Sequence, residues 1–247
     1  MKKIISLACM ILILFFVVFQ SVIADDSEYV TNEDPYETFN RPMFVFNDWL
    51  DKLILKPAST IYTRITPKPL SKGLGNIFNN IDTVPTIIND LLQANFYQAI
   101  NDTWRLVINS TIGIAGFFDV ASQIGLEPNN KQDLGLTLAR WGWVDSGYLV
   151  LPFLGPGTVR DQLTVYPNYF LSIYPQVNSR NVEYGLLAAS IIVKRAEILR
   201  YQNVLEQAAF DRYTFVKNAY LQRRSYLIGR NKELDNPYFL SDDLLPS

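Results

Sequence analysis

Aspartates beside aromatic or glycine-rich turns are the side chains best placed for acid–base chemistry in this sequence. They are Asp119, Asp133, Asp145 and Asp161. A glycosidase-like hydrolase needs two carboxyls at a defined separation across a cleft, but no spacing here singles out a pair. Aspartates at such positions more often cap helices or form turns. A carboxylate hydrolase is therefore the least favoured of the functions that we consider.

Histidine and cysteine, which many catalytic sites need, are absent or unsuitably placed. The 247-residue chain contains no histidine, and its one cysteine, Cys9, lies in an apolar N-terminal segment. Without an imidazole, Ser-His-Asp and Cys-His catalysis and histidine-ligated zinc are excluded. The glycine clusters lack the Lys-Ser/Thr of a phosphate loop, and no Gly-x-Ser-x-Gly elbow occurs. We predict a protein that is not an enzyme and holds neither metal nor cofactor.

Four arginines beside apolar segments could bind a phosphate group through their guanidinium. They are Arg41, Arg160, Arg223 and Arg224. Each also has a structural explanation: the first two could fix a turn by pairing with a carboxylate, and the last two could stabilise a helix C-terminus. The structural explanation is favoured, and contacts with a headgroup or a partner stay open.

The N-terminal segment has the features of a secretory signal. Residues 1–24 begin with a basic Lys2-Lys3 pair, continue through an apolar run and end in Val-Ile-Ala. An uncleaved membrane anchor is the alternative. We predict cleavage after Ala24, export to the cell envelope and a flexible, acidic lead-in over residues 25–35.

Apolar residues recur every three or four positions through much of the remaining chain, as in amphipathic helices. The first segment with this spacing is 36–65, which we expect to be interrupted or kinked at Pro57 and followed by a turn at Pro67. The next is a helix with Pro85 in its first turn. The others are 96–108, 185–205 and 211–228, the last with a stop at Gly229. Two glycine-rich apolar segments, 110–125 and 147–157, fit either closely packed membrane helices or buried core. We predict a mainly α fold, one helical domain over residues 36–229 and a loosely held polar tail over 230–247.

Charge and composition argue against nucleic acid as a partner. The chain has 22 basic and 24 acidic residues, and 49% of its residues are hydrophobic but only 19% charged. A nucleic-acid-binding domain would need a basic excess. Trp141, Trp143 and Tyr148 flank the glycine-rich segments, as aromatic residues do at a membrane interface.

Four blocks of sequence resemble the signatures of the MlaA/VacJ family. They are residues 34–41 (DPYETFNR) followed by 46–48 (FND), 109–121 (NSTIGIAGFFDVA), the long stretch 135–161 that ends in GYLVLPFLGPGTVRD, and 219–224 (AYLQRR). The blocks occur in the family's order and extend over nearly the whole chain after the leader.

This resemblance implies a ring-like helical protein whose amphipathic helices are embedded in the periplasmic leaflet of the outer membrane. In the family, an amphipathic channel takes misplaced phospholipid from the outer leaflet and passes it to a periplasmic carrier, MlaC, and trimeric porins are membrane partners. We expect the two glycine-rich segments to line or frame that path. The expected path residues are Gly113, Gly116, Phe117, Phe118, Tyr148, Leu149, Leu151, Phe153, Leu154, Gly155 and Gly157.

The signal junction departs from the family pattern. Family members often carry a lipid-modified cysteine there, whereas Cys9 comes too early and Ala24-Asp25 offers none. We therefore expect attachment through amphipathic helices rather than a lipid anchor. A structural or adaptor protein of the envelope, without a lipid path of its own, remains the first alternative function.

Overall fold

The protein is mainly helical, as predicted. The computed structural model describes residues 34–199, 201 and 211–233, so the predicted signal and nearly all of the lead-in and tail lie outside the described residues. The helices are α2 (Glu37–Leu50), the π-helix η1 (Asp51–Leu55), α3 (Lys56–Ile65), α4 (Lys68–Leu92), α5 (Phe96–Thr111), α6 (Val120–Gln123), α7 (Leu134–Arg140), α8 (Val159–Phe170), the 3-10 turn η2 (Tyr174–Gln176), α9 (Arg180–Leu199) and α11 (Arg212–Glu233). Two short strands, β1 (Tyr148–Leu151) and β2 (Gly155–Thr158), form a hairpin.

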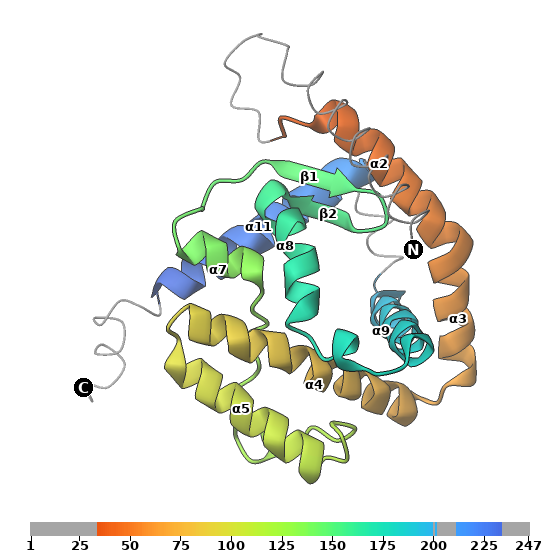
Figure 1. Cartoon of the computed structure of the whole chain (residues 1–247). Helices are drawn as coiled ribbons and strands as arrows, with labels where there is room; N and C mark the ends of the chain where they lie inside the picture. Colours follow the sequence, from red (N-terminus) through yellow and green to blue (C-terminus); the bar gives the residue numbers. More distant parts are fainter. Residues whose placement is uncertain (1–33, 200, 202–210, 234–247) are drawn as a thin grey trace, which may run out of the picture.

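These elements are arranged as a ring (Figure 1). The continuous helix made by α2, η1 and α3 forms one side, and α4 forms the next, with α5 packed along its outer edge. The hairpin, α7 and α8 close the circuit. α9 packs against α3 and α4, whereas α11 contacts α7 and β2. The ring-like helical fold implied by the family resemblance is confirmed.

The first side of the ring passes Pro57 without breaking. The sequence predicted an interruption or kink here, and the helix widens into η1 just before the proline. Proline cannot donate the usual backbone hydrogen bond, so a helix that continues past it must rearrange locally. In η1, Asp51 accepts two hydrogen bonds from Arg195 of α9, at 2.6 and 2.8 Å. This ion pair holds α9 against the long helix.

The second side differs from the prediction at its start. The turn expected at Pro67 is present, but the helix expected to begin near Pro85 begins at Lys68 and runs unbroken to Leu92. Pro85 lies inside α4, where it removes one backbone hydrogen bond without ending the helix. The prediction was wrong because it treated a proline that the helix tolerates as a helix start.

The hairpin was not predicted from the sequence. Its strands pair antiparallel, with Tyr148 opposite Thr158 and Leu151 opposite Gly155. The first three residues of β1 are all buried, so the strand lacks the alternation of apolar and polar residues that reveals a half-exposed strand.

Asparagine side chains of α2 bind the free edge of β1 as a neighbouring strand would. Asn40 Oδ1 accepts from the backbone N–H of Val150 at 2.8 Å, and Asn40 Nδ2 donates to the carbonyl of Tyr148 at 2.9 Å. Seven residues further along α2, Asn47 Nδ2 donates to the carbonyl of Leu151 at 2.9 Å. A carboxamide carries one donor group and one acceptor, so it can satisfy both backbone groups of an unpaired strand edge.

The last helix begins as predicted and ends later. Asp211 accepts from the backbone N–H of Tyr213 at 3.0 Å and so caps the start of α11. The predicted stop at Gly229 is wrong, because α11 continues to Glu233. A glycine lowers helix stability but does not end a helix by itself.

The two helices on the second side are polar inside and apolar outside. Their buried residues include Asn80, Thr83, Thr86, Asn89, Asp90, Gln98, Asn101, Asp102, Arg105 and Asn109. Their exposed large apolar residues are Leu70, Leu91, Leu92, Phe96, Tyr97, Ile100, Trp104 and Val107. This is the reverse of the pattern in a water-soluble globule.

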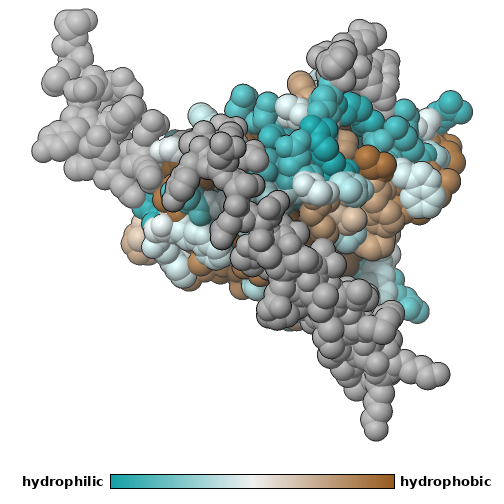
Figure 2. Space-filling view, turned by 90° about the horizontal axis from the view of Figure 1, so that it is seen from above, coloured by the Kyte–Doolittle hydropathy of each residue, from teal (hydrophilic) through white to brown (hydrophobic). Residues whose placement is uncertain are grey.

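Exposed apolar side chains continue around the ring. They include Val45, Trp49, Ile61 and Ile65 on the long helix, Leu163 and Tyr166 on α8, and Ile191 and Ile198 on α9. Figure 2 shows hydrophilic residues gathered toward the upper part of the view and hydrophobic residues toward its lower part. Within the described residues, no helix has the length and apolar character needed to cross a membrane. Amphipathic helices with this distribution can lie embedded in a bilayer without spanning it.

Candidate functional site

A polar cavity of about 620 Å³ lies between α4 and α11. Most of the residues that line it carry amide, hydroxyl or charged side chains, and polar and carbon atoms contribute about equally to its surface. Among the lining residues are Asn76, Asn79, Asn80, Asp82, Thr83, Thr86, Asn129, Lys131, Asp133, Asn168, Lys194, Arg223 and Arg224. Such a wall suits a polar or charged group, because hydrocarbon would leave these polar atoms without partners.

α4 supplies one wall through a row of polar residues at helical spacing. Asn76 Nδ2 donates to the carbonyl of Phe117 at 3.1 Å, and Asn80 Nδ2 donates to the hydroxyl of Ser110 at 2.9 Å. Asn79, between them, is exposed to the cavity, where its side chain accepts one long hydrogen bond of 3.4 Å from Lys131. The wall therefore combines fixed amides with one that is loosely held.

A salt bridge connects two helices across the cavity lining. Lys194 of α9 pairs with Asp82 of α4, and both side chains are partly exposed. An exposed pair of this kind contributes little to stability, since water competes for both charges. Both charges are thus available to a ligand that enters the cavity.

The α5 side of the cavity is held by a second set of charges. Arg105 donates to Asp119 at 3.0 Å, and Asn109 donates to the same carboxylate at 3.0 Å. Asp119 also caps α6 by accepting from the backbone N–H of Ser122. Burial by itself raises the pKa of Asp119, but these donors and the guanidinium charge outweigh burial and lower it.

Asp102 is a fully buried carboxylate of α5. It accepts hydrogen bonds from the amides of Gln98, Asn101 and Asn129, at 3.2, 3.2 and 3.0 Å. Burial raises the pKa of Asp102 from 3.8 to about 6, against the opposing effect of these donors. The amides compensate only part of the cost of burying the charge.

The raised pKa of Asp102 predicts a pH dependence of stability. Its protonation favours the folded state, so this contribution is complete below about pH 4 and is lost as the pH rises through about 6. We expect the melting temperature of the wild type minus that of Asp102→Asn to be larger at pH 4.5 than at pH 7.5. Thermal melts followed by circular dichroism in mild detergent measure this difference, and a constant difference between these pH values would contradict the assignment.

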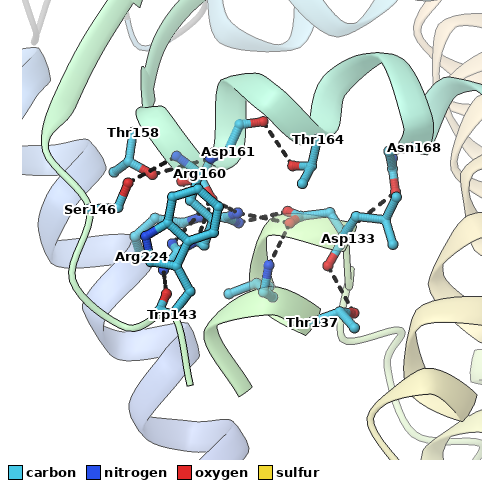
Figure 3. Close-up of polar contacts among 12 residues, drawn as sticks. Asp133, Thr137, Trp143, Ser146, Thr158, Arg160, Asp161, Thr164, Asn168 and Arg224 are labelled. Carbon is cyan, nitrogen blue, oxygen red and sulfur yellow. Dashed lines mark hydrogen bonds and ion pairs between the residues drawn. The ribbon is translucent and has the colours of Figure 1, made fainter. Parts of the chain in front are cut away.

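A buried ionic cluster lies where α7, α8 and α11 meet (Figure 3). Arg224 donates twice to Asp133, at 2.6 and 2.8 Å, and twice to Asp161, at 3.0 and 2.6 Å. The hydroxyl of Tyr220 donates to Asp161 at 2.6 Å. Gly135 makes this approach possible, since a Cβ at that position would collide with both Asp161 and Arg224.

Arg160 of α8 is the fourth charged group of the cluster. It is 1% exposed and donates to Asp161 at 3.1 Å and to the carbonyls of Trp143 and Val144 at 2.9 and 3.0 Å. Burial by itself raises the pKa of Asp161, but the hydrogen bonds from Arg224 and the guanidinium charges outweigh burial and lower it to about 2. The carboxylate is therefore ionised at every physiological pH.

A smaller pocket of about 320 Å³ adjoins the polar cavity and reaches the hairpin. Leu154, Gly157 and Val165 are among its lining residues. Asp133, Asn168, Tyr220 and Arg224 line both this pocket and the polar cavity. The ionic cluster thus lies between the polar cavity and the apolar tip of the hairpin.

The predicted path residues divide into two groups. In the first glycine-rich segment, Gly116 lies against Asn80 and the ring of Phe117 covers Gly73, so this loop supports α4 from behind the cavity wall. Phe118, by contrast, is half exposed and meets Phe117 edge to face. Gly113 packs within the same loop, where the backbone N–H of Phe118 donates to its carbonyl.

The second group forms the hairpin. Tyr148 and Leu149 are buried, and Leu151 is partly buried at the end of β1. Phe153 and Leu154 form an exposed tip, with Phe153 78% exposed, and Gly155 follows with a positive φ of 80°. Leu154 and Gly157 are the members of this group that line the 320 Å³ pocket.

The four arginines have different surroundings. Arg41 pairs with Glu37 and Asp211 on the surface, and its guanidinium lies over the ring of Tyr213. Arg160 is occupied by carbonyls and Asp161, as described above. The remaining two, in α11, line the polar cavity, where Arg224 is held by two carboxylates and Arg223 is exposed.

Sequence reasoning missed the polar wall of α4. The signal was present, because Asn76, Asn79, Asn80, Thr83 and Thr86 recur at three- and four-residue spacing. The apolar residues near the end of α4 predicted a helix there, but the polar residues before them form the face that lines the cavity. The hydrogen-bonding role of Asn40 was also missed, since its partner strand was not predicted.

Comparison with known proteins decides the family. The family model described as "MlaA lipoprotein" matches residues 32–227 of this sequence. The chain belongs to the MlaA lipoprotein family. The recognition made from the four sequence blocks is confirmed.

Relatives in this family share about a third of their residues with the chain. The protein of Haemophilus influenzae called intermembrane phospholipid transport system lipoprotein MlaA is 34% identical, over 90% of this chain and 89% of its own length. The Escherichia coli K12 protein of the same name is 31% identical, over 85% and 86%. An uncharacterised Rickettsia conorii protein is 36% identical over 85% and 90%. A structure solved in work on the structural basis for maintenance of bacterial outer membrane lipid asymmetry superposes with a TM-score of 0.66, at 28% identity, over 79% of this chain and 98% of its own.

The MlaA-like sequence blocks coincide with the contacts that hold the ring together. In the first block, the side chain of Asp34 accepts from Asn40 at 2.8 Å, and Asn40 in turn binds β1. In the later blocks, Gly135, Asp161 and Arg224 meet in the ionic cluster. In this chain, residues of these blocks therefore make contacts that join separate elements of the ring.

Proposed function

We propose that this chain is a non-enzymatic phospholipid-transfer component of the bacterial outer membrane. It removes misplaced phospholipid from the outer leaflet and passes it to a periplasmic carrier, which maintains lipid asymmetry. The observation that carries this proposal is the polar cavity of about 620 Å³ between α4 and α11, in a ring whose helices expose many large apolar side chains. The names of the relatives, which refer to intermembrane phospholipid transport, support the same lipid class.

The physical argument follows from the two parts of a phospholipid. A headgroup must keep hydrogen-bonding partners when it leaves water, and the amides and charges of the cavity offer them. Acyl chains need apolar surface, which the exposed side chains of the ring provide. Moving such a molecule requires neither the formation nor the breakage of a covalent bond.

Two observations support transfer over hydrolysis. A general acid needs a carboxyl whose pKa is raised toward neutrality, yet the pKa values of both Asp119 and Asp161 are lowered by their donors after the opposing effect of burial. Asp102 has the raised pKa, but its side chain is fully buried and cannot meet a substrate. None of these three carboxyls combines exposure with a raised pKa.

We place the chain in the periplasmic leaflet of the outer membrane, exported by its signal peptide and attached through its amphipathic helices. The proposed partners are phospholipid, an MlaC-like periplasmic carrier and a trimeric porin, as the family resemblance implies. The apolar outer faces of α4 and α5 support contact with a bilayer or an apolar membrane partner.

Outer-leaflet phospholipid in intact cells tests this function. In a Gram-negative strain that lacks its own family member, expression of this chain should lower the phospholipid accessible to added phospholipase. An unchanged level, with the protein correctly placed in the outer membrane, would contradict transfer. An adaptor without a lipid path is distinguished by mass spectrometry, since it would retain no phospholipid after extraction in mild detergent.

A further inference from the structure

A second large hollow, about 980 Å³, lies at the corner where α3, α4 and α9 meet. Three lysines line it: Lys56 from α3, and Lys68 and Lys72 from the first two turns of α4. Glu197 is the one carboxylate among its described lining residues. Among the described residues, the lining of the hollow therefore has more positive than negative groups, in contrast to the mixed charges of the polar cavity.

Two of these lysines are free to bind an anion. Lys68 and Lys72 are both exposed, and no carboxylate among the described residues forms an ion pair with either. Their positions, four residues apart on one helix, place both ammonium groups on the same face. α4 also begins here without a side-chain cap, so its first-turn N–H groups add positive potential at the same place.

The hydroxyls of the hollow fall into two kinds. Thr60 and Thr63 donate their protons to backbone carbonyls of α3, at 2.7 and 2.9 Å, and so have none to offer a ligand. Thr66 and Ser71 also line the hollow and make no such side-chain hydrogen bond within the described part of the chain. An oxyanion held by Lys68 and Lys72 would find these two hydroxyl donors on the same lining.

Exposed apolar side chains on the same helix segments indicate what kind of anion the hollow takes. Ile61, Ile65 and Leu70 belong to the turns of α3 and α4 that supply its lining, without lining it themselves, and they are 59%, 74% and 44% exposed. An inorganic anion would gain nothing from them, whereas acyl chains would cover them. Asn76 lines both this hollow and the polar cavity, so the two are adjacent.

We propose that the lysine-lined hollow binds the phosphodiester of a phospholipid headgroup before that headgroup reaches the polar cavity. Lys68 and Lys72 supply the charge, Thr66 and Ser71 supply hydrogen bonds, and Asn76 lines both the hollow and the polar cavity. The proposal rests on the phospholipid-transfer function and adds the position and chemistry of a headgroup subsite.

Calorimetric titration with dihexanoyl phosphatidylglycerol tests the subsite in the purified full-length chain. The double substitution Lys68→Gln/Lys72→Gln should weaken binding at least about tenfold, because each removes a charge-assisted contact. Lys52→Gln/Arg64→Gln is the matched control, since it removes two exposed cations from α3 and the π-helix before it but none that lines the hollow. Binding of uncharged dihexanoylglycerol should be the same in all three proteins.

The outcomes separate this subsite from the general function. If the wild type binds phosphatidylglycerol and both double variants bind it equally well, the subsite is wrong and phospholipid transfer stands. If inorganic phosphate binds the wild type as tightly as the lipid does, the hollow is a site for free anions and the lipid assignment is wrong. If the wild type binds no phosphatidylglycerol, both the subsite and the proposed function fall.

Discussion

Substitution of Asp161 by asparagine is expected to lower the free energy of unfolding by about 3–5 kcal/mol, the range found when one partner of a buried ion pair is removed. The cluster around it holds two guanidiniums, of Arg160 and Arg224, and two carboxylates, of Asp133 and Asp161. The substitution keeps the shape of the side chain but leaves one buried positive charge uncompensated. The melting temperature in mild detergent should fall by roughly 10 °C for a domain of this size.

A matched control and a double variant make this test specific. Asp145→Asn removes an aspartate that is exposed, so its effect should stay within about 0.5 kcal/mol. Asp161→Asn combined with Arg224→Met restores the balance of charge, and its cost should be smaller than the sum of the two single costs. Equal melting temperatures for Asp161→Asn and Asp145→Asn would show that the cluster does not hold the ring together.

Substitution of Asn79 by tryptophan is expected to abolish transfer while leaving the fold intact. Asn79 is exposed to the polar cavity, and its side chain makes only the 3.4 Å contact with Lys131 among the described residues. An indole at this position fills space that a headgroup needs and offers it a single donor in place of a carboxamide. Outer-leaflet phospholipid in cells that express this variant should rise to the level of cells without the protein.

Leu91→Trp is the control on the same helix. Leu91 is 51% exposed and is not among the residues that line the cavity, so a tryptophan there should leave transfer unchanged. Both variants should melt within a few degrees of the wild type. Wild-type transfer by Asn79→Trp, with the fold intact, would show that lipid does not pass through this cavity.

The sequence predicted the helices where apolar residues alone define them. Both α5 and α9 follow the three- and four-residue spacing. α5 begins at the predicted Phe96 and ends three residues later than predicted, at Thr111. α9 begins at Arg180, five residues before the predicted start, and its predicted end at residue 205 lies outside the described residues. The start of α4 was missed because Pro85 resembled a first-turn proline, although a long helix packed on both sides can tolerate one. Local sequence cannot show whether packing will compensate for a lost hydrogen bond.

The candidate site was predicted less completely, for a different reason. The first glycine-rich segment supplies Asp119 and Ser122 to the cavity lining, but α4 supplies more of the lining residues, and the loop around Phe117 packs against α4. The role of Asn40 depends on β1, which is more than 100 residues away in the chain. Arg160 looked like a possible phosphate ligand because its acceptors, the carbonyls of Trp143 and Val144, carry no sequence signal.

Photo-crosslinking from inside the polar cavity tests the account most directly. A benzophenone amino acid at position 79 in the cavity wall should form adducts with phospholipid in living cells, whereas the same group at exposed Asn181 of α9, which lines neither cavity nor hollow, should form few. Lipid adducts at position 79, identified by mass spectrometry, are the predicted result. A folded protein that gives no more lipid adduct at position 79 than at position 181 would contradict passage of phospholipid through the ring.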